Sequence, residues 1–157
     1  MSVIIPFGKS GMPLHADLGR AEVLESRVGE LKAADTEDGL VLAAMASPID
    51  SPRLRELAAG KKTCTIIISD HTRPVPSKHI IPAMLSELRE GSPGIDVTLL
   101  VATGFHRPTG REELVDKLGR EIVEREKIVI HNSRDASGNV RIGTLPSGAA
   151  CVIDKVA

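Results

Sequence analysis

Two short runs of ionisable residues each follow an apolar, strand-like segment. The first is Ser69-Asp70-His71-Thr72-Arg73-Pro74, and the second is Ala102-Thr103-Gly104-Phe105-His106-Arg107. In open parallel sheets, ligands bind beyond the carboxyl ends of the strands, and right-handed crossovers tend to make consecutive strands neighbours. We therefore expect the two runs to face each other across one site.

Three side chains in these runs suit proton transfer on a small anion. Histidine titrates near neutral pH, so His106 could move a proton. The planar guanidinium of Arg73 suits a carboxylate or a phosphate. Asp70 could be a base, a nucleophile or a metal ligand, or it could orient Arg73. The structural alternatives are a turn residue for Asp70, a surface ion pair for Arg73 and a loop histidine for His106.

Neighbouring residues offer weaker signals. Backbone N–H groups at Thr103 and Gly104 could cradle an anion. His131 ends a strand-like segment and could line the same edge, whereas the direction of His71 is ambiguous, and Phe105 is either a pocket wall or a core residue. Neither a G-x-G-x-x-G motif after a strand nor a Walker lysine motif is present, which argues against a dinucleotide site and a P-loop.

The segments around the two runs predict a mostly parallel α/β sheet. Apolar, β-branched stretches at 64–68, 97–101 and 128–130 are typical of strands that helices cover on both faces. Residues 77–90 have helical spacing, with Pro82 requiring a late start or a kink. A capping box at 109–112 predicts a second helix that ends at Gly119.

The flanking segments predict smaller elements. The first 45 residues alternate short apolar stretches with glycines, which is typical of a small antiparallel ribbon. Ser51, Pro52 and Gly60 hold the N-cap, first and post-terminal positions of a short helix. Residues 140–142 and 151–153 predict further strands. We expect one α/β domain over residues 1–157, with flanking helices and an N-terminal β ribbon.

Composition excludes several classes of partner. The 157 residues have a net charge of −1, which does not favour nucleic-acid binding. No apolar run approaches the roughly 20 residues that cross a bilayer, and no signal peptide is apparent, so we expect a cytoplasmic protein without membrane contact. Cys64 and Cys151 lack the spacing of a zinc or redox motif, and we expect both to be reduced.

The two runs resemble motifs of the nickel-dependent lactate racemase family. The N-terminal domain of that family carries an Asp-x-Thr-Arg-Pro motif and an Ala-Thr-Gly-x-His-Arg motif, which stand here at 70–74 and 102–107. The likeness extends through 47–49 and 54–60 before the first motif and 108–118 after the second. Two motifs in this order, separated by one strand–helix unit, are far more specific than either alone.

The resemblance implies the N-terminal domain of a 2-hydroxyacid racemase or epimerase. Its cofactor would be a nickel-pincer nucleotide, a pyridinium mononucleotide that holds nickel and takes hydride from the substrate Cα. By position, His106 matches a catalytic acid–base histidine, Arg73 an active-site arginine for the substrate carboxylate and Asp70 a supporting carboxylate. We assign cofactor contacts to Thr72, Thr103 and Gly104, and we expect no metal ligand in this chain.

The family's cofactor-tethering lysine, nickel-ligating histidine and second catalytic histidine belong to a C-terminal domain without a counterpart here. Lys155 is too close to the chain end to match that lysine. We therefore expect the isolated chain to be inactive and to need this missing domain as a partner. A non-catalytic module that binds small anions is the alternative. Phosphoryl transfer with Asp70 as nucleophile is a third function, but it lacks a second nearby acid for magnesium.

Overall fold

A computed structural model describes residues 2–15, 19, 22, 24 and 26–157, and the chain divides after residue 34 into two units. In the first unit, β1 (Ser2–Phe7) and β2 (Ser10–His15) form an antiparallel hairpin, which confirms the expected ribbon. A 3-10 helix follows at Val28–Glu30. Two apolar stretches assigned to the ribbon, 14–18 and 21–24, lie partly outside the described residues.

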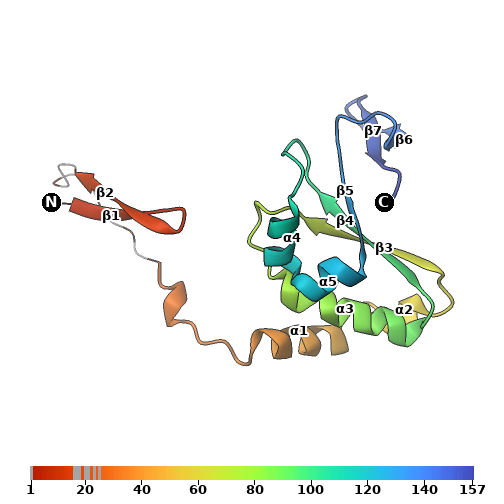
Figure 1. Ribbon diagram of the computed structural model, residues 1–157. Coiled ribbons are helices and arrows are strands. Elements are labelled where there is room, and N and C mark those ends of the chain that lie inside the picture. The colour runs from red at the N-terminus through yellow and green to blue at the C-terminus, as the bar shows by residue number, and fades with distance from the viewer. Residues whose placement is uncertain (1, 16–18, 20–21, 23, 25) are drawn as a thin grey trace. The chain divides into compact units, whose positions relative to one another are not determined.

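The second unit is built on a parallel sheet in the order β3-β4-β5 (Figure 1). Ser69 pairs with Ala102, so the loops that begin at Asp70 and Thr103 start side by side. The elements of this unit are α1 (Glu37–Ala46), α2 (Leu54–Ala58), β3 (Thr63–Ser69), α3 (Ser77–Gly91), β4 (Asp96–Ala102), α4 (Arg111–Leu118), α5 (Arg120–Arg125), β5 (Lys127–Ile130), β6 (Asn139–Thr144) and β7 (Ala150–Asp154).

One face of the sheet carries the core, because alternate strand residues point to the same side. Helices α3 and α4 pack against this face (Figure 1). Ile67, on the opposite face of the edge strand β3, is 61% exposed. The expectation that helices cover both faces is therefore wrong for β3. The side chains buried on this face include Ile66, Ile68, Val97, Leu99 and Val101 from the sheet and Ile81, Leu85, Leu88, Leu114 and Leu118 from the helices. Leu100, on the opposite face of β4, is also buried.

Three helices differ from the sequence-based expectation. Helix α1 occupies residues assigned to the ribbon, because the Thr36 hydroxyl accepts the Gly39 N–H at 3.1 Å and caps its first turn. Helix α2 begins at Leu54 rather than Pro52, since the Glu56 carboxylate accepts the backbone N–H of Arg53 at 2.8 Å. Helix α5, between Gly119 and β5, was not predicted.

The remaining helix and strand predictions hold in part. Helix α3 starts at Ser77 and includes Pro82, so the late start is wrong. Helix α4 ends before Gly119 as expected, where φ is +87°, but the carboxylate that accepts the Gly110 N–H belongs to Glu113 rather than Glu112. Strands β6 and β7 exist, and they pair with each other in an antiparallel hairpin instead of extending the parallel sheet.

Glu87 of α3 joins this helix to α2. Its largely buried carboxylate accepts hydrogen bonds from Nη2 of Arg55 at 2.5 Å and from the backbone N–H of Arg55 at 3.2 Å, and it pairs with the Arg53 guanidinium. These contacts, led by the Arg55 side chain, lower the pKa of Glu87 to about 2. The helix pair that supports the sheet therefore depends on an ionised Glu87.

Leu99 is fully buried in the central strand, so we expect its truncation to reduce the stability of the fold strongly. Leu99→Ala is expected to lower the free energy of unfolding by about 2–5 kcal/mol, because the cavity it leaves can close only in part. Urea denaturation measures this loss. Leu31→Ala, at a side chain that is 77% exposed, is the matched control and should cost less than about 1 kcal/mol. Equal losses in the two variants would contradict this description of the core.

Glu87→Gln is expected to lower the free energy of unfolding at neutral pH. The variant should also lose less of that free energy than wild type as the pH falls. The pKa of Glu87 in the folded state is about 2, below the ordinary value of 4.5, so its contribution is present above pH 4.5 and is lost as the pH falls toward 2. Urea unfolding across this range should show the difference between wild type and variant narrowing in acid. A difference that stays constant would contradict the prediction. Glu112→Gln, on an exposed residue of α4, is the control.

Candidate functional site

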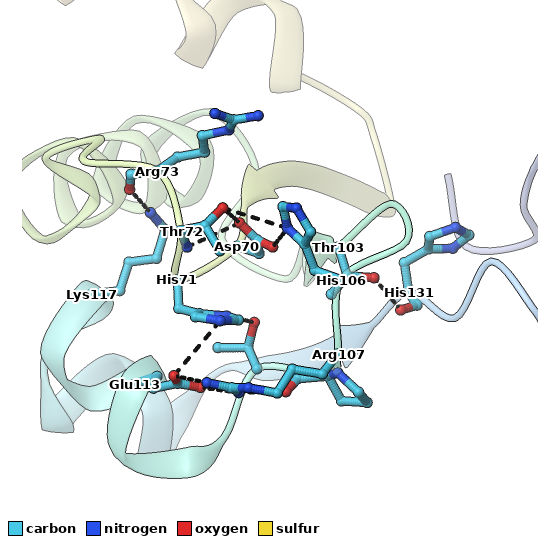
Figure 2. Close-up of polar contacts among 12 residues, drawn as sticks. Asp70, His71, Thr72, Arg73, Thr103, His106, Arg107, Glu113, Lys117 and His131 are labelled. Atoms are coloured by element: carbon cyan, nitrogen blue, oxygen red, sulfur yellow. Dashed lines mark hydrogen bonds and ion pairs between the residues drawn. The ribbon is translucent and has the colours of Figure 1, made fainter.

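The two polar runs meet at the carboxyl ends of β3 and β4 through a contact between Asp70 and His106 (Figure 2). Nδ1 of His106 lies 2.5 Å from Oδ2 of Asp70. The other carboxylate oxygen, Oδ1, accepts the hydroxyl of Thr72 at 2.6 Å and its backbone N–H at 3.1 Å. Asp70 is only 2% exposed. The expectation that the two runs face each other is confirmed.

These contacts decide the protonation state of Asp70. The Thr72 hydroxyl, then the His106 ring and the Thr72 backbone N–H, hold the pKa of this carboxyl well below its usual range, against the opposing effect of burial. An ionised carboxylate only accepts hydrogen bonds, so Nδ1 of His106 must be the donor. In the neutral imidazole, Nε2 is then the unprotonated nitrogen. The His106 side chain is 48% exposed, and it can take a proton from a ligand.

Arg73 lies in the turn after Asp70, but its guanidinium is not part of the Asp70–His106 pair. Figure 2 shows the two groups apart, and both Asp70 oxygens are engaged by Thr72 and His106. Asp70 therefore does not orient Arg73. The Arg73 side chain is exposed, and no carboxylate in the described part of the chain pairs with it. Its charge is available to an anion.

The three residues assigned to cofactor contacts have different surroundings. Thr72 is exposed, with its hydroxyl donating to Asp70. Thr103 is 3% exposed, and its hydroxyl donates to the carbonyl of His131 at 2.6 Å, which links the ends of β4 and β5. Gly104 has a φ of +56°, and no atom lies within 4 Å of the position a Cβ would take. A ligand could therefore approach the Gly104 backbone closely.

The other candidates separate into a site wall and structural contacts. Phe105 is 84% exposed, which excludes the core alternative. His131 contacts Asp154 at 3.0 Å between Nδ1 and Oδ2, and this contact joins the end of β5 to β7. His71 points away from the Asp70–His106 pair, toward Thr109. A hollow of about 340 Å³ beside His106 is lined by residues 105–108 and 132–134.

Sequence reasoning missed two charged residues behind the loops, Glu113 and Lys117. The Glu113 carboxylate pairs with the Arg107 guanidinium at 2.6 and 2.8 Å, and Nζ of Lys117 donates to the backbone carbonyl of Arg73 at 3.0 Å. Their spacing carried a usable signal, because residues four apart share one helix face. That face belongs to the helix that follows the second motif directly.

Two kinds of site have no candidate within the described residues. No group of three or more His, Cys, Asp and Glu side chains is arranged to hold a metal ion. None of the helices described combines the length and the apolar character that a membrane span requires.

Comparison with known proteins yields consistent sequence matches. A family model described as the lactate racemase N-terminal domain matches residues 7–157. A lactate racemase of Thermoanaerobacterium thermosaccharolyticum is 42% identical over 157 residues, which are 99% of this chain and 37% of that protein. A lactate racemase of Lactiplantibacillus plantarum is 52% identical over 122 residues, which are 78% of this chain and 29% of that protein. The chain thus spans about a third of the length of these relatives.

Solved structures agree with the fold. The lactate racemase apoprotein of T. thermosaccharolyticum superposes with a TM-score of 0.82 and 40% identity, covering 99% of this chain and 36% of that one. A Thermotoga maritima protein, 21% identical, gives a TM-score of 0.55 over 73% of this chain and 29% of that one. At this identity the second likeness concerns the fold alone. The first supports a parallel α/β sheet preceded by a hairpin.

Asp70→Asn is expected to change which ring nitrogen of His106 carries the proton. The asparagine amide can present a donor to Nδ1, so the tautomer with a proton on Nε2 becomes populated. Long-range ¹H–¹⁵N NMR spectra of the neutral imidazole measure this change directly. Asp116→Asn, on an exposed residue of α4, is the matched control and should leave the His106 spectrum as in wild type. An unchanged tautomer in Asp70→Asn would contradict the assigned role of Asp70.

Proposed function

The chain belongs to the lactate racemase N-terminal domain family, and from this premise we propose that it forms one wall of the active site of a racemase or epimerase for small 2-hydroxyacids. The observation that carries the proposal is the Asp70–His106 pair, with Arg73, which pairs with no described carboxylate, in the turn after Asp70. Proton transfer and carboxylate binding are the two tasks that a 2-hydroxyacid imposes. Because the chain covers 29–37% of its relatives' length, the complete enzyme would include a further C-terminal domain.

Arg73 would bind the substrate carboxylate. Its guanidinium is exposed and carries a charge that no described carboxylate neutralises. A planar guanidinium can hold both oxygens of a carboxylate at once, which fixes the orientation of the attached carbon. The hydroxyl on that carbon can then be directed toward His106.

His106 would accept the substrate hydroxyl proton at Nε2 and later return it. Asp70 keeps the proton on Nδ1 and stabilises the imidazolium that forms, because its carboxylate stays ionised. A bound nickel-pincer nucleotide would supply the acceptor and donor of the Cα hydride. We place a second proton carrier, which would serve the opposite enantiomer, outside residues 1–157.

The residues at this edge are compatible with a bound nucleotide. The exposed Thr72 and the open backbone of Gly104 would face the cofactor, and buried Thr103 would hold the Gly104 loop through His131. The ligands that hold nickel would come from the nucleotide itself and from the C-terminal domain. The isolated chain would then be inactive. Both cysteines are free thiols, which is compatible with a cytoplasmic location.

A non-catalytic module that binds small anions is the second candidate. The feature that favours it is again the unpaired Arg73, since binding an anion requires no proton carrier. Tight lactate binding by the isolated chain, without turnover in any longer form, would favour this module over the racemase. Phosphoryl transfer on Asp70 has less support, because both carboxylate oxygens are already hydrogen-bonded.

The test is lactate racemisation by a polypeptide that joins residues 1–157 to the C-terminal domain. His106→Ala is expected to lower kcat by roughly 100-fold or more, the usual contribution of a general base. Arg73→Ala should chiefly raise KM, because it removes the carboxylate contact. His15→Ala and Arg111→Ala, at exposed positions, are the controls. Wild-type kcat in His106→Ala together with wild-type KM in Arg73→Ala would refute the proposed function.

A further inference from the structure

We propose that Glu113 and Lys117, one turn apart on α4, are positioning residues. They hold the first loop, which follows β3 and carries Arg73, and the second loop, which follows β4 and carries His106, in the arrangement that lets one substrate meet both side chains. The inference rests on the proposed function, because this arrangement matters when one substrate meets both side chains. Neither residue belongs to the two motifs. Both side chains extend from α4 to the loops and contact them away from the Asp70–His106 pair (Figure 2).

Glu113 fixes the second loop at two points. Its Oε1 and Oε2 atoms pair with the two terminal nitrogens of Arg107, at 2.6 and 2.8 Å, and Oε2 also accepts the backbone N–H of Gly110 at 2.8 Å. Arg107 directly follows His106. A two-point pair with a planar guanidinium restrains direction as well as distance, so Glu113 restrains the backbone that carries His106.

Glu113 also reaches the first loop. Nε2 of His71 lies 3.7 Å from Oε1 of Glu113, and Nδ1 of His71 lies 3.1 Å from the hydroxyl of Thr109, which is 3% exposed. His71 directly follows Asp70. The His71 side chain of the first loop is thus held between Thr109, which belongs to the second loop, and Glu113, which belongs to the first turn of α4.

Lys117 fixes the first loop beyond His71. Its Nζ donates to the backbone carbonyl of Arg73 at 3.0 Å, and burial lowers the pKa of this amine. The contact restrains the backbone of Arg73 and leaves its guanidinium unengaged. Lys117 therefore restrains the backbone position of Arg73 and leaves the guanidinium group available to an anion.

The helix that carries these two residues is itself fixed in the core. Leu114 and Leu118 directly follow Glu113 and Lys117 and are 7% and 1% exposed. Burial of this pair holds α4 against the sheet whose strands β3 and β4 end at Ser69 and Ala102, directly before the two loops. Both loops are thus attached to the same helix, α4. This attachment would keep the backbones of Arg73 and His106 at a fixed relative position, although their side chains do not touch.

A purely local role makes a different prediction. If Glu113 only capped α4 and Lys117 were only a surface cation, their removal would destabilise the helix or change nothing. A positioning role instead predicts faster motion of the two loops while the core stays protected. The backbone amides that report it are hydrogen-bonded within the loops: Arg73 donates to the Asp70 carbonyl at 3.3 Å and His106 to the Thr103 carbonyl at 3.0 Å.

Amide hydrogen exchange, measured by NMR on the 157-residue chain, tests the proposal without requiring turnover. Lys117→Met is expected to accelerate exchange at Arg73 about tenfold, and Glu113→Gln to do the same at His106, while β4 amides stay within about twofold of wild type. Glu112→Gln makes the same chemical change one residue away and should leave both amides unchanged. Lys117→Arg keeps a donor and should restore Arg73 toward wild type.

Unchanged exchange at Arg73 and His106 in the variants would overturn the proposal, as would equal acceleration throughout β4. In the joined polypeptide, Lys117→Met should raise the KM for lactate more than it lowers kcat. An active racemase with unchanged kinetic constants in both variants would also overturn the positioning role, while the proposed function would stand. Absence of racemisation in the wild type would instead count against the proposed function, and the exchange rates would still decide whether α4 restrains the loops.

Discussion

The contact between Asp70 and His106 joins two loops that are 36 residues apart in the chain. It depends on the parallel pairing of β3 and β4, because the pairing of Ser69 with Ala102 starts both loops at the same level of the sheet. It also depends on Thr72, which occupies the second oxygen of Asp70 and keeps that carboxyl ionised. An ionised Asp70 in turn decides which nitrogen of His106 is free. Strand register therefore determines the proton chemistry available at this edge.

Contacts on the other side of the loops complete this arrangement. Thr103 links the end of β4 to the end of β5, and Glu113 and Lys117 link the loops to α4. Each of these residues is anchored on an element that packs into the core. Among the described residues, the Arg73 guanidinium and Nε2 of His106 have no protein partner, while these contacts hold the backbone near each of them. This division between anchored and unpaired groups is what a binding edge requires.

Much of this arrangement was predictable from the sequence, for an identifiable reason. The buried strands before Asp70 and Thr103 are continuous apolar runs, and the rule for parallel sheets places their ends together. The first helix was missed because Gly39 in its first turn lowers helix propensity, although Thr36 followed by Glu37 and Asp38 is typical of a helix start. Glu113 and Lys117 were missed because their partners are a neighbouring motif and a backbone carbonyl. The contact of Lys117 with the Arg73 carbonyl, 44 residues away in the chain, depends on the tertiary fold, whereas the Glu113–Arg107 pair is local.

The Asp70–His106 pair, the unpaired Arg73 and the family assignment together support one wall of a racemase site, contributed by a chain that spans about a third of its relatives' length. The most direct test is the mass of the native protein in its cell extract, with nickel measured on the same purified material. The account predicts a polypeptide much longer than 157 residues that carries nickel. A metal-free native species of 157 residues would contradict it and would favour the anion-binding module.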